Sequence, residues 1–218
     1  MPDPVDFYFD FISPYAYLGS TQIDAVAAQH GRKVNWRPVL IGVTIMKIMG
    51  MKPLPETPMK GDYLRQDAPR MAKIFGVPFQ YHGHKGSNSL AACRSFLWIK
   101  QQDEDLAIRF AHRVFRKLWV DGKDITPAES VAEEAAALGI DTPAMLAAIA
   151  ADAGKQALND AVDQAIKAGA FGVPYMVADG EAIWGCDRMW MLEYWLAHGT
   201  WEGAGAAVLT KAGKTTPA

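Results

Sequence analysis

Hydrophobic and polar positions follow strand-like patterns at the two ends of the chain and a helical pattern in its middle. Residues 5–12 form an aromatic and β-branched run, which is typical of a buried strand. Residues 33–37 alternate with period two before Pro38. Between these runs, small and branched residues recur at helical spacing over residues 14–30, and Gly31 predicts the stop. This strand–helix–strand unit predicts two parallel strands with a right-handed crossover.

The middle of the chain is predicted to be helical. A capping box at residues 126–129, Thr-Pro-Ala-Glu, indicates one helix start. No fixed repeat period links the helices, so we expect an inserted helical domain and not a solenoid. The pattern predicts helices over residues 63–75, 88–101, 105–119, 127–139, 142–154 and 155–168.

The pattern then returns to strands. Two short runs, 174–178 and 181–184, flank Asp179-Gly180, which predicts a type I′ hairpin. Asp187 is expected to cap a final helix that ends near Ala197. The sequence therefore predicts a discontinuous α/β domain that consists of residues 1–45 and 169–202. A helical domain is expected over residues 46–168, and a flexible tail over residues 203–218.

Composition and charge narrow the class of protein. The 218 residues are 50% hydrophobic and 21% charged, as in a soluble globular protein. The formal net charge of -2 gives no electrostatic footprint for nucleic acid. No run of apolar residues is long enough to span a membrane, and the N-terminus lacks the pattern of a signal peptide. We therefore expect a cytoplasmic protein that binds neither nucleic acid nor membranes.

The cysteines and histidines argue against redox and metal chemistry. Cys93 and Cys186 are far apart and are expected to be free thiols. The chain has no Cys-x-x-Cys, which excludes dithiol chemistry at the turn after the first strand. His82 and His84 have a spacing that could suggest a metal ligand pair, but no nearby Cys, Asp or further His supports it. We expect a loop there and no metal site.

The stretch that follows the first strand is the first candidate for chemistry. Residues 13–19 read Ser-Pro-Tyr-Ala-Tyr-Leu-Gly, which places Ser13 at a helix N-cap and Pro14 at the first helical position. In open α/β sheets this edge binds ligands, and a helix N-terminus favours an anion. A simple cap is the alternative role for Ser13. No Gly-x-Ser-x-Gly elbow is present, which disfavours a Ser-His-Asp hydrolase.

Two later motifs extend this picture. Residues 171–174 read Phe-Gly-Val-Pro and residues 184–188 read Trp-Gly-Cys-Asp-Arg. With Asp-Phe-Ile-Ser-Pro-Tyr-Ala-Tyr-Leu at residues 10–18, they resemble the DsbA-like branch of the thioredoxin-like superfamily. Redox members carry Cys-x-x-Cys where residues 13–16 read Ser-Pro-Tyr-Ala. The chain thus resembles kappa-class glutathione transferases and, most closely, 2-hydroxychromene-2-carboxylate isomerases, over about residues 4–200.

The resemblance implies a fold and a cofactor. The fold is an α/β, DsbA-like thioredoxin domain with a large inserted all-helical domain, and the cofactor is reduced glutathione. Its thiol, with a pKa of roughly 8.5, would be stabilised as a thiolate by the hydroxyl of Ser13 and the helix N-terminus. The backbone of Val173, before a cis Pro174, would pair with the cysteinyl main chain.

The same resemblance places the γ-glutamyl end of glutathione on four successive residues, Trp184, Gly185, Cys186 and Asp187. Backbone groups there would take its carboxylate and Asp187 its ammonium. Without the resemblance, Asp187 is a cap alone. Cys186 stands where the family commonly has serine or glutamine, and it could form a mixed disulfide with glutathione. Tyr175 follows the proline where threonine is common.

Residues 42–61 are rich in methionine and proline, and two interpretations stay open. They form either an irregular surface connection or an adaptable apolar lid over a flat organic ligand. Lys47, Lys52 and Lys60 could meet an anionic group there. Met51 lies near where the family usually carries asparagine. The substrate-side candidates are Met51, Lys52, Tyr81 and Asn88.

The function implied is a glutathione-dependent isomerase acting on a flat aromatic carboxylate. Thiolate addition would open the ring, allow rotation about a transient single bond, and end in elimination. Two alternatives stay open. One is a kappa-like glutathione transferase, and the other is a thioredoxin-like binding module that has lost catalysis. Members of the family are commonly dimers, so a homodimer is expected.

Overall fold

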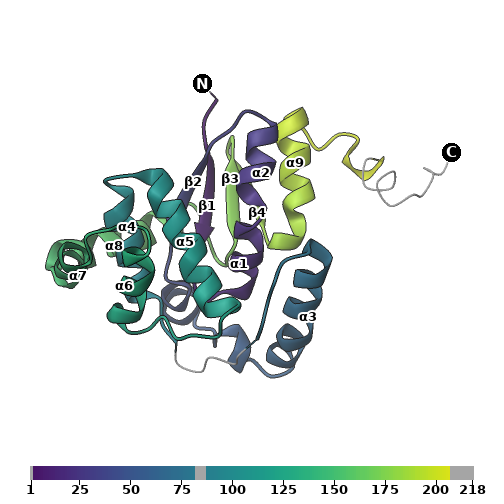
Figure 1. The fold of residues 1–218 in the computed structure, drawn as a ribbon. Coiled ribbons are helices and arrows are strands. Elements are labelled where there is room, and N and C mark those ends of the chain that lie inside the picture. Colours follow the sequence, from purple (N-terminus) through teal and green to yellow (C-terminus); the bar gives the residue numbers. More distant parts are fainter. Residues whose placement is uncertain (1, 82–86, 207–218) are drawn as a thin grey trace.

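The computed structural model describes residues 2–81 and 87–206, and its centre is a four-stranded sheet (Figure 1). The strand order is β2-β1-β3-β4. The strands are β1 (Val5–Phe9), β2 (Val34–Pro38), β3 (Tyr175–Ala178) and β4 (Glu181–Trp184). β1 is parallel to β2 and antiparallel to β3, and β3 is antiparallel to β4. The predicted parallel pair and the predicted hairpin are confirmed.

Helices surround this sheet on both sides. Those between β2 and β3 are α3 (Lys60–Phe75), α4 (Leu90–Lys100), α5 (Glu104–Trp119), α6 (Ala128–Ala136), α7 (Thr142–Ala150) and α8 (Asp152–Lys167). The others are α1 (Pro14–Ser20), α2 (Ile23–Gln29) and α9 (Met189–His198), and three short helical turns are η1 (Val43–Ile48), η2 (Leu54–Glu56) and η3 (Cys186–Arg188). In Figure 1, α6, α7 and α8 lie to the left of the sheet and α2 and α9 to its right.

The aromatic residues of β1 join the sheet to the inserted helices. Phe9 is fully buried, and its ring centroid lies 5.3 Å from that of Trp36 on β2. The same ring lies 5.2 Å from Phe96 of α4 and 5.7 Å from Phe115 of α5. Such close aromatic packing stabilises the contact beyond the area it buries. One hydrophobic cluster therefore includes both parts of the chain, and the domain boundaries at 45/46 and 168/169 stay predictions.

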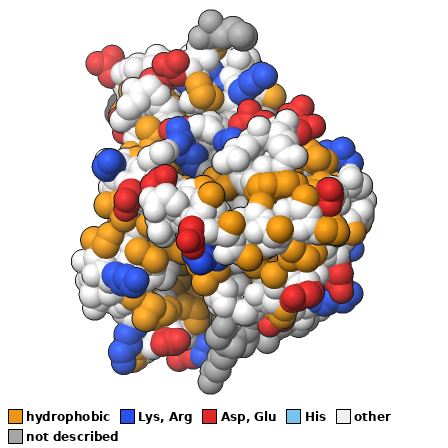
Figure 2. Space-filling model, turned by 90° about the vertical axis from the view of Figure 1, so that its left-hand side faces the viewer, with side chains coloured by type: hydrophobic (Ala, Val, Ile, Leu, Met, Phe, Trp, Pro, Cys, Tyr) orange, Lys and Arg blue, Asp and Glu red, His pale blue; other side chains and the backbone are white. Residues whose placement is uncertain are grey.

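The outer face of the insertion is mixed in character. Figure 2 shows the side that carries α6 to α8, where apolar side chains lie among acidic and basic ones. Beneath this face, Lys117 of α5 is almost fully buried and its Nζ lies 2.6 Å from the carboxylate of Glu133 and 3.5 Å from that of Glu134. A buried charge requires such partners. These two ion pairs connect α5 to α6.

The first predicted helix is wrong in one respect, because it is two helices. The break falls at Thr21 and Gln22. There the Thr21 hydroxyl and the Gln22 amide both donate to the carbonyl of Leu18, at 2.8 and 3.2 Å. Polar side chains that bond to nearby backbone groups compete with helical hydrogen bonds. The predicted stop at Gly31 is confirmed by its φ of 66°.

Three helix boundaries also differ from the prediction. The helix expected from Tyr63 begins at Lys60. The capping box at residues 126–129 does not form, because the Thr126 hydroxyl accepts from the N–H of Asn88 and Pro127 is the N-cap. Gly154 does not end a helix but lies inside α8, where a Cβ would stand 2.4 Å from the carbonyl oxygen of Ala148 and glycine is therefore needed.

The sequence suggested that Asp187 caps the last helix, and this prediction is wrong. Instead, η3 precedes α9, and neither helix has a side-chain cap hydrogen bond. β1 also ends at Phe9, before the predicted limit at residue 12. The chain leaves the strand at Asp10, whose carboxylate accepts the N–H of Ile12 at 3.2 Å.

Some expectations concern residues that the structure does not describe. His82 and His84 lie outside the described residues, as do residues 207–218 of the predicted tail. Within the part that is described, no group of three His, Cys, Asp or Glu side chains could hold a metal ion. None of the helices in residues 2–81 and 87–206 has the length and apolar character needed to cross a membrane.

Candidate functional site

Ser13 lies at the carboxyl end of β1, where it caps α1. Its backbone is extended (φ -95°, ψ 118°), and its hydroxyl oxygen accepts the N–H of Ala16 at 3.2 Å. The same hydroxyl donates to the carbonyl oxygen of Val173 at 3.4 Å. This second bond is long, so the hydroxyl proton is weakly held and can turn toward a better acceptor.

The loop before β3 meets Ser13 from the opposite side. The Val173–Pro174 peptide bond is cis, as the family resemblance implied. Val173 is buried, and within the described residues its N–H donates no hydrogen bond. Buried N–H groups normally have an acceptor. The backbone of Val173 therefore offers this N–H together with the carbonyl that accepts the Ser13 hydroxyl.

A close approach of α1 holds this loop in place. A Cβ on Gly19 would stand 3.0 Å from Cγ of Pro174. A side chain at this position would have to push the proline ring aside by a few tenths of an ångström. The glycine at the end of the Ser-Pro-Tyr-Ala-Tyr-Leu-Gly motif thus fixes the distance between α1 and the Val173–Pro174 loop.

The turn between β4 and η3 completes one side of the site. The N–H of Gly185 donates to the carbonyl of Pro174 at 2.9 Å. Gly185 has a φ of 104°, and a Cβ there would stand 2.4 Å from Oδ1 of Asp187. Another residue would therefore be disfavoured at this position both by conformation and by contact. The Asp187 side chain is 57% exposed and lies 3.7 Å from the Arg188 guanidinium.

An exposed indole lies next to this turn. Trp184 is 46% exposed, and the ring of Phe171 lies 4.9 Å from it in an edge-to-face arrangement. The guanidinium of Arg188 lies 5.8 Å from the Trp184 ring centroid and donates to the Trp184 carbonyl at 2.6 Å. The indole is thus held in one orientation beside the Val173–Pro174 loop.

Cys186 is placed differently from what a mixed disulfide requires. Its side chain is 2% exposed. Burial, with the nearby Asp187 carboxylate as a smaller cause, raises the pKa of the Cys186 thiol to about 12. Thiol–disulfide exchange needs an accessible thiolate. The structure therefore disfavours a mixed disulfide at Cys186 and leaves its backbone as the group that can contact a ligand.

Tyr15, in the Ser13 turn, is bonded to α3. Its phenol donates to Oδ2 of Asp67 at 2.9 Å. Burial and this carboxylate raise the pKa of Tyr15 above its usual value, so the phenol stays neutral. Asp67 also accepts from Arg70 at 3.3 Å. The ring of Tyr15 is thereby fixed as a wall of the neighbouring cavity.

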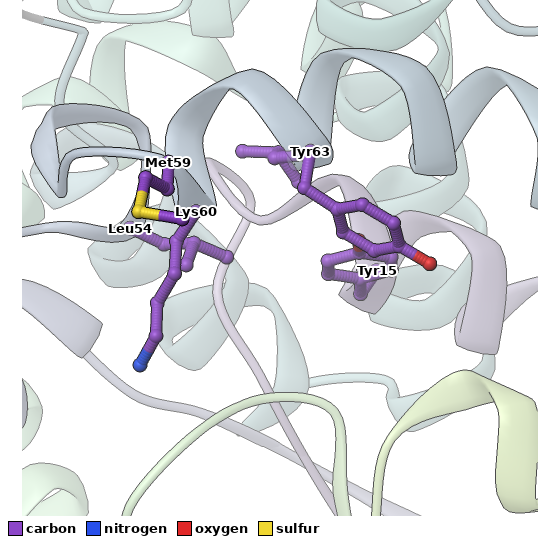
Figure 3. A pocket seen from close by; sticks show the side chains of 6 residues that line it. Tyr15, Leu54, Met59, Lys60 and Tyr63 are labelled. Carbon is purple, nitrogen blue, oxygen red and sulfur yellow. The ribbon is translucent and has the colours of Figure 1, made fainter.

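That cavity has a volume of about 420 Å³ and lies between the Ser13 turn and the start of α3. Figure 3 shows the rings of Tyr15 and Tyr63 on one side of it and Leu54, Met59 and Lys60 on the other. Its lining residues are Tyr15, Leu54, Met59, Lys60, Tyr63 and Leu64. The walls are almost entirely apolar and include two aromatic rings, which suits a flat apolar ring.

The fold and site motifs match a family model. The model of the DsbA-like thioredoxin domain matches residues 4–197. This range covers the sheet, the inserted helices and both halves of the site.

The chain belongs to the DsbA-like thioredoxin family.

Curated relatives of this DsbA-like chain are enzymes of two kinds. 2-Hydroxychromene-2-carboxylate isomerase of Pseudomonas putida is 28% identical over 192 residues, which cover 87% of this chain and 92% of the relative. Glutathione S-transferase kappa 1 of Rattus norvegicus is 27% identical over 214 residues, which cover 93% and 94%. A solved structure of 2-hydroxychromene-2-carboxylate isomerase superposes with a TM-score of 0.80 at 27% identity, covering 93% of this chain and 98% of that one.

The contacts described above link Ser13, Val173, Pro174 and Gly185. The same stretch of chain as Gly185 contains Trp184, Cys186 and Asp187. Their roles in this DsbA-like protein stay predictions. The four substrate-side candidates, Met51, Lys52, Tyr81 and Asn88, do not line the cavity.

These four residues lie in other parts of the fold. Met51 and Lys52 are exposed. The Tyr81 ring packs 6.3 Å from that of Trp119. The Asn88 side chain accepts the N–H of Leu90 at 3.2 Å. Sequence reasoning missed Tyr15 and Tyr63 as cavity residues, although Tyr15 lies in the motif and Tyr63 follows Lys60 by one helical turn.

Proposed function

We propose that this protein is a glutathione-dependent isomerase of a flat aromatic carboxylate similar to 2-hydroxychromene-2-carboxylate. The observation that carries the proposal is the contact between the Ser13 hydroxyl and the backbone of Val173. It brings a hydrogen-bond donor for sulfur next to a backbone edge that can pair with a peptide. The isomerase relatives, similar over nearly the whole chain, support this choice.

The residues present fit glutathione. The unpaired N–H of Val173 and its carbonyl would pair with the cysteinyl main chain as an added strand does. The carbonyl becomes fully available for this pairing when the Ser13 hydroxyl turns from it to the sulfur. On the same side, the backbone of residues 185–187 and the exposed Asp187 carboxylate would hold the γ-glutamyl carboxylate and ammonium.

Ser13 would control the protonation of the thiol. A hydroxyl that donates to sulfur favours the thiolate, and each unit by which the thiol pKa falls requires about 1.4 kcal/mol. Turning from the Val173 carbonyl loses little, since that bond is 3.4 Å long. When bound, glutathione would supply a nucleophilic thiolate, whose addition lets the ring open and a transient single bond rotate, and whose elimination returns the thiolate.

The cavity would orient the substrate for this chemistry. The rings of Tyr15 and Tyr63 offer flat apolar walls, and the Lys60 amine offers a cation for the carboxylate. Tyr15 cannot serve as a base, because its phenol already donates to Asp67 and its pKa is raised. The polar groups of the chain thus position the two reactants, and the bond changes occur between them.

A kappa-like glutathione transferase is the second candidate. The rat transferase is as similar to this chain as the isomerases are. It would use the same residues to form the thiolate and would release a conjugate. A homodimer and a cytoplasmic location also stay proposals, inferred from the resemblance.

A spectrophotometric assay with 2-hydroxychromene-2-carboxylate, with and without reduced glutathione, tests the proposal. We expect glutathione-dependent isomerisation with full recovery of glutathione. Ser13→Ala should lower kcat/KM by about 10- to 100-fold, as expected for the loss of one hydrogen bond to a charged group. Ser20→Ala, the same change at the other end of α1, should leave kcat/KM within about twofold.

Other results would select another function. A glutathione conjugate of the substrate would indicate the transferase. Isomerisation without glutathione would contradict the role of Ser13 and Val173. Absence of glutathione binding by calorimetry would indicate a thioredoxin-like binding module without catalysis.

A further inference from the structure

Asp10 is a carboxylate buried beneath the Ser13 turn. It is 1% exposed and lies between two aromatic residues of the core, Phe9 and Phe11. Among the described residues, no cationic side chain pairs with it. Burial of an unpaired carboxylate is unfavourable, so its presence here calls for a use that an apolar or amide side chain could not fulfil.

The two oxygens of Asp10 accept N–H groups from two separate segments. Oδ1 accepts from Ile12 at 3.2 Å, and Oδ2 accepts from Ile41 at 2.8 Å. Ile12 directly precedes Ser13, whose own N–H donates to the Asp10 carbonyl at 3.0 Å. Ile41 lies at the start of the helical segment that continues into η1. Both N–H groups precede a helical turn and have no acceptor within it.

The segment that begins at Ile41 leads to the methionine-rich stretch. Met46, Met49 and Met51 are all exposed, on the same chain that leaves the carboxyl end of β2. The Ser13 turn leaves the carboxyl end of β1, the parallel neighbour of β2. The two segments begin at the same edge of the sheet (Figure 1), and the Asp10 carboxylate connects them.

The surroundings of Asp10 leave it as the group that titrates. Burial raises the pKa of the Asp10 carboxyl to about 6, and its interactions with the Ser89 side chain and with the N–H groups of Ile41 and Ile12 oppose this. From α4, Cys93 faces it, and burial and the Asp10 charge raise the pKa of that thiol, so it stays neutral. The Arg94 guanidinium partly opposes the rise in the pKa of the Cys93 thiol. Ser89, directly before α4, interacts with Asp10 and carries no charge. The Ser13 turn and η1 contribute backbone N–H groups to it and no charged side chain.

We propose that Asp10 is a positioning residue of the ligand site: its ionised carboxylate fixes the Ser13 turn and the start of the 41–48 segment together, and its protonation loosens both. A protonated carboxyl carries one O–H donor, so it cannot accept two N–H groups equally well. The ionised carboxylate of Asp10 holds the site, and burial disfavours this ionised form. Stability and ligand binding therefore change in opposite directions when the charge is removed.

This inference rests on the proposed glutathione site, so its first test uses a ligand without an ionisable thiol. Binding of S-methylglutathione is measured by calorimetry from about pH 5 to about pH 8. In the natural protein we expect binding to tighten about tenfold as Asp10 ionises, since one hydrogen bond to a charged acceptor corresponds to roughly that factor. In Asp10→Asn we expect a flat profile, binding about tenfold weaker above pH 7, and a thermal midpoint that does not fall.

Asp24→Asn is the matched control. Asp24 of α2 is a carboxylate whose side chain is 44% exposed; it accepts one N–H, from Trp36 at 3.1 Å, and lies 3.9 Å from His112. It lies outside the Ser13 turn, so its variant should keep the pH dependence of binding. A purely structural role of Asp10 would lower the thermal midpoint and leave the shape of the pH profile unchanged, which would overturn the inference.

A second test needs no ligand. The backbone N–H resonances of Ile12 and Ile41 are followed by NMR against pH. They should titrate together near pH 6 in the natural protein and not in Asp10→Asn. If they titrate but S-methylglutathione binds with a flat profile, the link to the site is wrong. If no glutathione derivative binds at any pH, the proposed function fails, while the two resonances still decide whether Asp10 joins the two segments.

Discussion

The hydroxyl of Ser13 donates to the carbonyl of Val173 at 3.4 Å, although the two residues are 160 positions apart in the chain. This contact joins the cap of α1 to the cis Val173–Pro174 loop. It also means that one side chain both begins a helix and faces the backbone edge proposed to bind glutathione. Changes at Ser13 should therefore affect both stability and ligand binding.

Removing the Ser13 hydroxyl should destabilise the fold by the usual amount for a cap. We expect Ser13→Ala to lower the free energy of unfolding by about 1 kcal/mol, measured by urea denaturation. Ser13→Thr keeps a capping hydroxyl and should retain most of this free energy. If Ser13→Ala is as stable as the natural protein, the bond to Ala16 does not contribute as the geometry indicates.

A methyl group at Gly19 should disturb the site from behind. Its Cβ would stand 3.0 Å from Cγ of Pro174, and overpacking of this kind lowers stability by about 1–3 kcal/mol. We expect Gly19→Ala to show this loss in urea denaturation and to bind glutathione more weakly by calorimetry. Gly42→Ala is the control, because its Cβ would meet no atom within 4 Å. That variant should be unchanged or slightly more stable, by up to about 1 kcal/mol.

The hydrogen bond between Tyr15 and Asp67 should affect both the free energy of unfolding and the ionisation of the Tyr15 phenol. Tyr15→Phe should lower the free energy of unfolding by about 1–2 kcal/mol, because it removes the phenol that donates to the carboxylate. Tyr63→Phe, at a side chain that is 57% exposed, should change it by less than about 0.5 kcal/mol. In ultraviolet titration, Tyr15 should ionise at a pH above the usual range of a phenol, and ionisation within that range would contradict the burial of its phenol.

The two cysteines should not react in the folded protein. Cys93 and Cys186 are both buried, and burial raises the pKa of each thiol. At neutral pH both are protonated and shielded from solvent, so a disulfide reagent should label them only after denaturant is added. Mass spectrometry after treatment with oxidised glutathione should find no adduct on either. Rapid labelling of Cys186 in the native state would show that its surroundings are more open than described.

Asp10 should make stability fall as the solution becomes less acidic. Its pKa rises from an ordinary 3.8 to about 6 in the folded protein, so between these values the folded state binds more protons than the unfolded state. The free energy of unfolding therefore decreases with rising pH across this window, by up to about 3 kcal/mol in total. Urea denaturation at several pH values should show this slope in the natural protein and its loss in Asp10→Asn. An unchanged slope in that variant would assign the effect to another group.

The local elements of the site can be predicted from patterns in the sequence. The aromatic run of β1, the Ser13–Pro14 helix start and the Asp179-Gly180 turn are set by neighbouring residues, since strand pattern, capping and positive φ are local properties. The motifs at residues 10–18, 171–174 and 184–188 also led to the DsbA-like family. The helical insertion followed from the long helical pattern between the strands.

Which side chains meet depends on how distant segments of the chain pack together. No local pattern could place Asp10 between Ile12 and Ile41, bury Cys186, or choose Tyr15, Lys60 and Tyr63 as cavity walls in place of Met51 and Lys52. The same holds for the break after Ser20, where side chains compete with the backbone for the Leu18 carbonyl. Burial and contact between distant segments depend on how the elements pack, and packing fixes both the pKa of a carboxyl and the shape of a cavity.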